Sequence, residues 1–113
     1  MDCIFCSIIK GEIPSKKVYE DENFYAFEDI SPVAPVHVLI IPKKHIQSIA
    51  AITKEDEAVT ALYLPTVQKV AQQLGLDKTG YRLIFNTGES AGQTVHHMHA
   101  HLIGGKELGW PGV

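Results

Sequence analysis

The residues best suited to chemistry are the histidines, and four of the six fall within six consecutive positions. In a β-strand, successive side chains point to opposite faces. A strand over residues 95–103 therefore places His97, His99 and His101 on one face, about 6.5–7 Å apart. The other face carries His96, Met98, Ala100 and Leu102, which is mostly typical of a core. A solvated face does not need three imidazoles, so this spacing indicates a functional row.

Two kinds of chemistry fit this row of histidines. Two of them can hold one metal ion, with the third or His37 completing a hydrolytic zinc site. Alternatively, one imidazole attacks phosphorus while its neighbours bind phosphate oxygens or relay protons, because imidazole is partly neutral at pH 7. The preceding segment favours the second interpretation, since Gly88, Gly92, Gln93 and Thr94 can bring N–H and hydroxyl donors close to a phosphate.

A second cluster of reactive side chains is the Cys3-x-x-Cys6 pair near the start of the chain. By itself the pair fits two small apolar residues, a redox pair or half of a zinc site. A redox role lacks the neighbouring strand and helix that it requires. A zinc site needs two further ligands, and the chain offers His45 and His97.

Composition limits the class of protein. The 113 residues are 45% hydrophobic and 20% charged, which predicts one globular domain over residues 1–113. Ten Lys and Arg against thirteen Asp and Glu give a net charge of −3 with no basic stripe, which argues against nucleic-acid binding. No apolar run could span a bilayer, the first residues do not resemble a secretory signal, and two cysteines make no disulfide framework. We therefore expect a cytoplasmic protein without a nucleic-acid or membrane partner.

The elements that must position these residues can be read from periodicity and breakers. Residues 5–10 predict a short helix ended by Gly11, and strands are expected over residues 18–20, 24–28, 36–41, 81–85 and 95–103. A long helix begins after Thr53 and ends at Gly75, and Pro65 should kink it or mark its true start. Connections such as that between residues 20 and 24 are too short for crossovers, so the pattern predicts an α+β fold with an antiparallel sheet.

The sequence resembles the histidine triad (HIT) superfamily. Its pattern His-φ-His-φ-His-φ-φ, with φ apolar, is matched by His97-Met98-His99-Ala100-His101-Leu102-Ile103. Other matching motifs are Ile4-Phe5, Gly11-Glu12-Ile13-Pro14, Asp29-Ile30-Ser31-Pro32 with Ala34-Pro35, Ile40-Ile41-Pro42-Lys43-Lys44-His45, Asn86-x-Gly88 and Gly92-Gln93-Thr94-Val95. The ending, Gly104-Gly105 with Trp110-Pro111-Gly112, is similar to the Hint branch. The resemblance covers nearly the whole chain.

This resemblance implies a five-stranded antiparallel sheet with one long and one short helix, paired into a homodimer with a ten-stranded sheet. It also implies a hydrolase that cleaves purine nucleoside 5′-phosphoramidates or related nucleotidyl conjugates and releases AMP or GMP without a catalytic cofactor. Three alternatives stay open: dinucleoside polyphosphate hydrolysis, a purine-nucleotide-binding dimer with little turnover, and a metallohydrolase that uses the same histidines.

The resemblance also implies roles for individual residues. His99 corresponds to the nucleophile, His101 to the group that contacts the phosphate and the leaving atom, and His97 and His37 to supporting histidines. Asp29 corresponds to the acceptor of the ribose hydroxyls. The remaining positions are the base-pocket walls Phe5, Ile8, Phe27 and Ile30, the phosphate-side residues Asn86, Gly92, Thr94 and Val95, and Trp110, which reaches the partner's site. On residue type alone, Asp29 fits a turn cap, Asn86 a turn, and the apolar residues an ordinary core.

For the cysteine pair, some members of the superfamily and the related galactose-1-phosphate uridylyltransferases resemble an arrangement of Cys3, Cys6, His45 and His97. Four protein ligands leave no open position, so such a zinc ion would be structural. This departs from the metal-free Hint pattern. It also places two demands on His97, because a metal-bound nitrogen cannot relay a proton.

Overall fold

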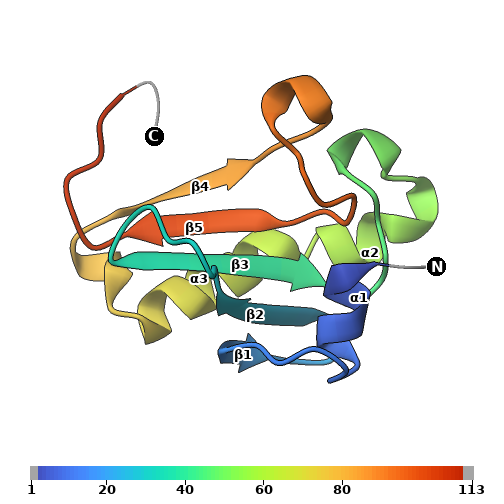
Figure 1. Ribbon diagram of the computed structural model, residues 1–113, viewed down its shortest axis with the longest axis horizontal. Helices are drawn as coiled ribbons and strands as arrows, with labels where there is room; N and C mark the ends of the chain where they lie inside the picture. Colours follow the sequence, from blue (N-terminus) through green and yellow to red (C-terminus); the bar gives the residue numbers. More distant parts are fainter. Residues whose placement is uncertain (1–2, 111–113) are drawn as a thin grey trace.

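The computed structural model describes residues 3–110, and its framework is one antiparallel sheet (Figure 1). The five strands lie in the order β1-β2-β3-β5-β4. They are β1 (Lys17–Glu20), β2 (Phe24–Glu28), β3 (Val36–Pro42), β4 (Tyr81–Phe85) and β5 (Ala100–Gly104). The expected α+β class and antiparallel sheet are confirmed, and β3 and β5 lie side by side at its centre.

Alternation along the strands gives the sheet two apolar faces. On β2, Phe24 and Ala26 belong to a core that is covered by α3 (Tyr63–Gln73), whereas Tyr25 and Phe27 face α1 (Ile4–Ile9). Figure 1 shows α3 crossing behind the sheet and α1 lying in front of it, at the end where β3 finishes. The α1 face carries the histidines and Asp29, so the α3 face serves as the structural core.

The long helix begins later than the run of apolar residues suggests. After Thr53 come a 3₁₀ turn (Lys54–Asp56), one helical turn, α2 (Glu57–Thr60), and then a break before α3. Pro65 lies in the first turn of α3, where its missing N–H has no intrahelical partner to lose. It therefore marks the true start of the helix, and Gly75, with a φ of 76°, follows its end.

The last strand is shorter than predicted. Residues 95–99 were expected to be part of it, but β5 begins at Ala100, which pairs with Ile40 as the last partner on β3. Beyond that point the backbone turns away, and the Met98 N–H donates to Ile46 O instead of to a strand. Met98 and Leu102 still point into the α3 core and His97 and His99 remain buried. The expected core side of His96 is wrong, because His96 is exposed.

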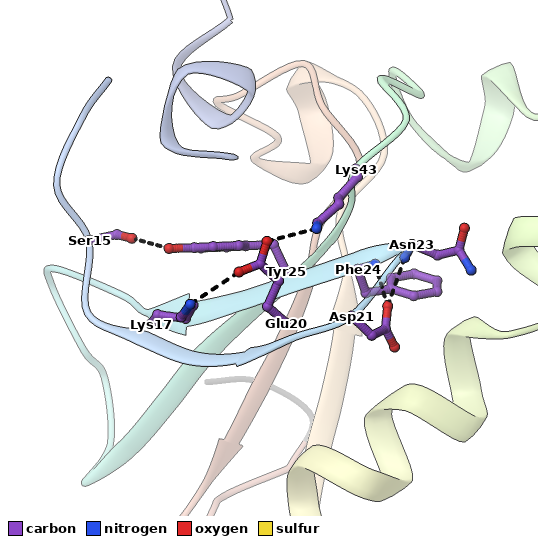
Figure 2. Close-up of polar contacts among 8 residues, drawn as sticks. All are labelled: Ser15, Lys17, Glu20, Asp21, Asn23, Phe24, Tyr25 and Lys43. Carbon is purple, nitrogen blue, oxygen red and sulfur yellow. Dashed lines mark hydrogen bonds and ion pairs between the residues drawn. The ribbon is translucent and has the colours of Figure 1, made fainter. Parts of the chain in front are cut away.

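Charged side chains fasten the β1–β2 hairpin at the edge of the sheet (Figure 2). One carboxylate oxygen of Asp21 accepts the backbone N–H groups of Asn23 and Phe24, both at 2.8 Å, which fixes the turn. Lys43, which follows β3, reaches Glu20 at 2.7 Å. No helix within residues 3–110 is long and apolar enough to cross a membrane.

The phenol of Tyr63 joins α3 to the sheet and yields a test of this packing. Its hydroxyl donates to Ile40 O in the buried core, and burial raises the pKa of the phenol well above its usual range. Tyr63→Phe should remove this hydrogen bond and lower the free energy of unfolding by about 1 kcal/mol, measured by urea denaturation. Tyr81→Phe, at an exposed position, is the matched control, and equal losses in the two variants would contradict the assignment.

Candidate active site

Three imidazoles form a continuous group on the α1 face of the sheet. The ring centroids of His99 and His101 are 5.0 Å apart, and those of His101 and His37 are 5.2 Å apart. His101 lies on β5 and His37 on β3, in neighbouring strands that bring them together although 64 residues separate them. The structure therefore gathers three of the four histidines that the resemblance places in catalysis.

A backbone carbonyl fixes the tautomer of the neutral His99 ring. The Nδ1 atom of its ring lies 2.8 Å from His97 O. Because a carbonyl oxygen can only accept, the hydrogen of the neutral ring is on Nδ1. The Nε2 atom therefore has a free lone pair. The ring is 7% exposed and stands edge-on to Phe5, with centroids 5.1 Å apart, which restricts its rotation.

A backbone N–H fixes His37 and His101 in the same way. The Val33 N–H donates to His37 Nδ1 at 3.2 Å, so the proton of the neutral His37 ring is on Nε2. This Nε2 lies 2.9 Å from His101 Nδ1, which must then be the acceptor. The neutral His101 ring consequently carries its proton on Nε2. His99 and His101 thus present opposite properties, a lone pair on one Nε2 and a proton on the other.

The surroundings of His101 keep its ring neutral. Burial lowers its pKa to about 4, and the neighbouring rings of His99 and His37 act in the same direction. The carboxylate of Asp29 opposes this shift, but more weakly. Asp29 Oδ2 is 3.5 Å from His37 Nε2, and Asp29 Oδ1 accepts the Ser31 N–H at 2.7 Å. Lone pairs of this carboxylate remain for further hydrogen bonds.

A cavity of about 510 Å³ opens beside Asp29. Ile8, Phe27 and Ile30 line it, so three of the four expected base-pocket walls share one cavity with the expected ribose acceptor. Phe5, the fourth, packs behind them against Phe27, with centroids 5.6 Å apart.

Two of the expected phosphate-side residues line a different cavity from Asp29. Thr94 and Val95 line a cavity of about 710 Å³ between the start of α1 and the segment after β3. Asn86 follows β4, and Gly92 has a φ of 86° that favours glycine. Trp110 is 86% exposed, with the Arg82 guanidinium 5.8 Å from its ring, and it lines neither of these two cavities.

Gln93 stabilises the loop before the histidines. Its buried amide donates to Gln47 O and Val95 O and accepts the Gly88 N–H, at 2.7, 3.1 and 2.9 Å. The side chain is therefore occupied in holding residues 88–95 in place, and the Gln93 backbone N–H, a donor expected near the phosphate, donates to Gly88 O at 3.1 Å. The backbone groups of Val33, Pro42 and His97 escaped the sequence analysis, because no side-chain pattern indicates where a carbonyl or N–H will point.

The two cysteines, His45 and His97 converge on one point. Their ligand atoms all lie within 4.8 Å of one another, close enough to bind a metal ion. His97 Nδ1 is 3.4 Å from Cys3 Sγ, 3.6 Å from Cys6 Sγ and 3.2 Å from His45 Nδ1, and Cys6 Sγ is 3.4 Å from His45 Nδ1. With Zn–S bonds of about 2.3 Å and Zn–N bonds of about 2.0–2.1 Å, the ligands of tetrahedral zinc lie about 3.3–3.8 Å apart.

The outer contacts of this cluster also suit a metal. His97 Nε2 donates to Pro42 O at 2.8 Å, which leaves the lone pair of Nδ1 directed at the sulfurs. Burial lowers the pKa of His97 and so favours the neutral ring that a metal ion requires. Both cysteines are free thiols, and the Cys6 N–H donates to Cys3 Sγ at the start of α1.

The chain is similar to several known proteins. The family model described as HIT domain matches residues 10–108. The chain is 45% identical to a purine nucleoside phosphoramidase of Escherichia coli K12 over 108 residues, 96% of this chain and 91% of that protein. It is 49% identical to an uncharacterized HIT-like protein of Synechococcus elongatus over 97% of this chain and 96% of that one. A crystal structure of a HIT family hydrolase from Legionella pneumophila superposes with a TM-score of 0.93 at 49% identity, covering 97% of this chain and 98% of that one.

The low pKa of His101 predicts a measurable pH dependence. We expect NMR titration of its ring to give a midpoint near pH 4, below the ordinary value of 6.5. The unfolded chain then binds a proton between these pH values that the native protein does not, so the free energy of unfolding should fall as the pH is lowered through this range. His101→Gln should make this decline shallower in urea denaturation series. A midpoint at or above 6.5 would contradict a desolvated, neutral His101.

Proposed function

Because the chain belongs to the HIT domain family, we propose that it hydrolyses purine nucleoside 5′-phosphoramidates through a covalent nucleotidyl intermediate on His99. The relatives include HIT family hydrolases, a purine nucleoside phosphoramidase among them. The observation that carries the proposal is the pair of opposite tautomers, with an unprotonated Nε2 on His99 and a protonated Nε2 on His101.

In the proposed complex, the nucleoside occupies the cavity beside Asp29. The carboxylate accepts the two ribose hydroxyls, and Ile8, Phe27 and Ile30 enclose the base. The α-phosphate then lies against His99 and His101, with Asn86, Gly92, Thr94 and Val95 on its other side. Binding in this pose places phosphorus within reach of a fixed nucleophile, which removes most of the orientational cost of attack.

The proposed reaction has two balanced steps. In the first, the His99 Nε2 lone pair forms a bond to phosphorus while the P–N bond to the amine, which is protonated on its nitrogen, breaks and the neutral amine leaves. His101 Nε2–H donates a hydrogen bond to the phosphate and then to the departing nitrogen as its lone pair forms. In the second, water attacks the nucleotidyl-His99, the P–N bond to His99 breaks, and the nucleoside monophosphate leaves with a proton of the water while His99 returns to its neutral form. His37 donates to His101 Nδ1 throughout, so His101 keeps its proton on Nε2.

We further propose that Cys3, Cys6, His45 and His97 hold a structural zinc ion. The contact distances and the direction of His97 Nδ1 support a tetrahedral site, and four protein ligands leave no position for substrate. When bound, the ion would tie α1 to the segment after β3 and to His97. No reaction step requires it.

A homodimer through the edge of β4 is part of the same proposal. β4 lies at one end of the strand order, which leaves one of its edges without a neighbouring strand within residues 3–110. Tyr81 on β4 and Leu64 on α3 are exposed, as is Trp110. We expect Trp110 to approach the partner's site and to influence the choice of leaving group. Two free thiols in the chain fit a cytoplasmic location.

Replacing His99 tests the covalent mechanism. His99→Gly should abolish hydrolysis of adenosine 5′-phosphoramidate, by at least about 10³-fold in kcat, while calorimetry shows AMP binding within a few fold of the wild type. Acid-quench mass spectrometry should detect a nucleotidyl adduct in the wild type but not in the variant. His96→Ala, at an exposed position next to the cluster, is the matched control and should keep full activity. Hydrolysis by His99→Gly at the wild-type rate would refute the mechanism.

Removing one ligand tests the metal site. The purified wild type should contain about one zinc ion per chain by elemental analysis, and Cys6→Ser should lose this ion together with thermal stability. Because the ion is proposed to be structural, chelation should lower the Tm while the chains that remain folded retain their kcat. Wild-type protein that binds no zinc after equilibration with it would overturn the assignment, and loss of kcat in fully folded, chelated protein would indicate a catalytic metal instead.

A further inference from the structure

The lining of the cavity beside Asp29 includes one uncharged polar side chain, that of Ser15. Besides its apolar walls, the cavity is lined by Pro14, Ser15 and Lys16, the segment that leads into β1. Ser15 Oγ is 2.8 Å from the hydroxyl oxygen of Tyr25 (Figure 2). Neither residue matches a motif of the family pattern, and the reaction proposed above makes no use of them.

The spacing along β2 relates this polar pair to a bound nucleoside. Tyr25, Phe27 and Asp29 are alternate residues of an extended segment, so their side chains share one face at intervals of about 7 Å. A ribose at Asp29 places the purine over Phe27, and the six-membered ring of the base then points toward the Tyr25 end. The interval of about 7 Å between alternate side chains is comparable to the length of a purine ring system.

The other polar residues that line the cavity, Lys16, Glu28 and Asp29, are charged. Asp29 faces the ribose end, and Glu28 alternates to the opposite face of β2, where it also borders a small cavity next to Leu74 of the segment after α3. The Lys16 carbonyl accepts the Glu28 N–H at 3.0 Å, and its side chain belongs to an exposed residue. Ser15 is thus the uncharged polar side chain available at the base end of the cavity.

Two hydroxyls in contact form a versatile hydrogen-bonding group. Tyr25 is buried at 8% exposure, packed with Phe27 and Leu39, and its phenol meets the half-buried Ser15. When one hydroxyl donates to the other, one hydrogen and several lone pairs remain for a ligand. The pair can therefore donate to an acceptor or accept from a donor, and each hydroxyl holds the other in position.

We propose that the Ser15 and Tyr25 hydroxyls read the hydrogen-bonding edge of the purine base and make this cavity selective for bases with a polar six-membered ring. Adenine and guanine differ in the direction of their edge groups, and a hydroxyl pair accommodates both. A base of the same shape without edge groups cannot replace the water that it displaces from the hydroxyls, so it binds more weakly. This inference rests on the proposed nucleotide site.

A binding comparison tests the inference without turnover. The ligands are AMP, GMP and benzimidazole riboside 5′-monophosphate, which has the purine shape but no polar atoms on its six-membered ring. In calorimetry, the wild type should bind AMP and GMP about three- to tenfold more tightly than the benzimidazole nucleotide, the amount expected for one neutral hydrogen bond. Ser15→Ala should reduce this ratio to near one by weakening only AMP and GMP. Tyr25→Phe should reduce it in part, since Ser15 remains but is no longer held.

The controls separate three results. Ser7→Ala removes another half-buried serine hydroxyl, on α1 and outside the residues that line this cavity, and should keep the wild-type ratio. The affinity for the benzimidazole nucleotide reports whether each variant has kept its folded pocket. A wild-type ratio near one, or a ratio unchanged in Ser15→Ala, would overturn the inference while leaving the nucleotide site intact. Failure of all three nucleotides to bind the wild type would overturn the nucleotide site itself.

Discussion

The arrangement depends on one constraint: a backbone carbonyl can only accept a hydrogen bond and a backbone N–H can only donate one. His97 O therefore sets the tautomer of His99, and the Val33 N–H sets that of His37 and, through it, of His101. A neutral imidazole has one donor and one acceptor, so fixing one nitrogen decides the other. The proposed nucleophile, His99, and the proposed hydrogen-bond donor, His101, thus differ although they have the same side chain.

The central strands are what hold these backbone groups in place. β3 carries His37 and ends at Pro42, whose carbonyl accepts from His97, and β5 carries His101 opposite Leu39. Helix α1 closes the site from the front, since Phe5 contacts the rings of both His97 and His99. Cys3 and Cys6 flank Phe5 in sequence, so a ligand held by the two thiols would also fix the aromatic ring that confines His99. Stability of the amino-terminal helix and orientation of His99 are consequently linked.

Much of this structure could be predicted from the sequence, and the exceptions have a common cause. Alternation identified four of the strands within one or two residues, and Pro65 and Gly75 marked the ends of α3, because these signals are local. The start of β5 was not predictable, since it depends on where pairing with β3 ends. The wrong assignment of His96 to the core face results from the same error. The spacing placed His97, His99 and His101 together correctly in outline. The Val33 and Pro42 contacts depend on the paths of loops that only tertiary packing determines.

His97 shows how one residue can serve both clusters. From the sequence, a metal-bound ring nitrogen is incompatible with a relay to the neighbouring histidines. In the structure the two duties fall on different atoms: Nδ1 faces the thiols and His45, Nε2 is anchored on Pro42 O, and the main-chain carbonyl orients His99. The ring therefore need not transfer any proton during the proposed reaction. A Cys-x-x-Cys terminus is accordingly compatible with the proposed role of His99, and binding a metal at His97 Nδ1 would make the position of the His97 carbonyl more rigid.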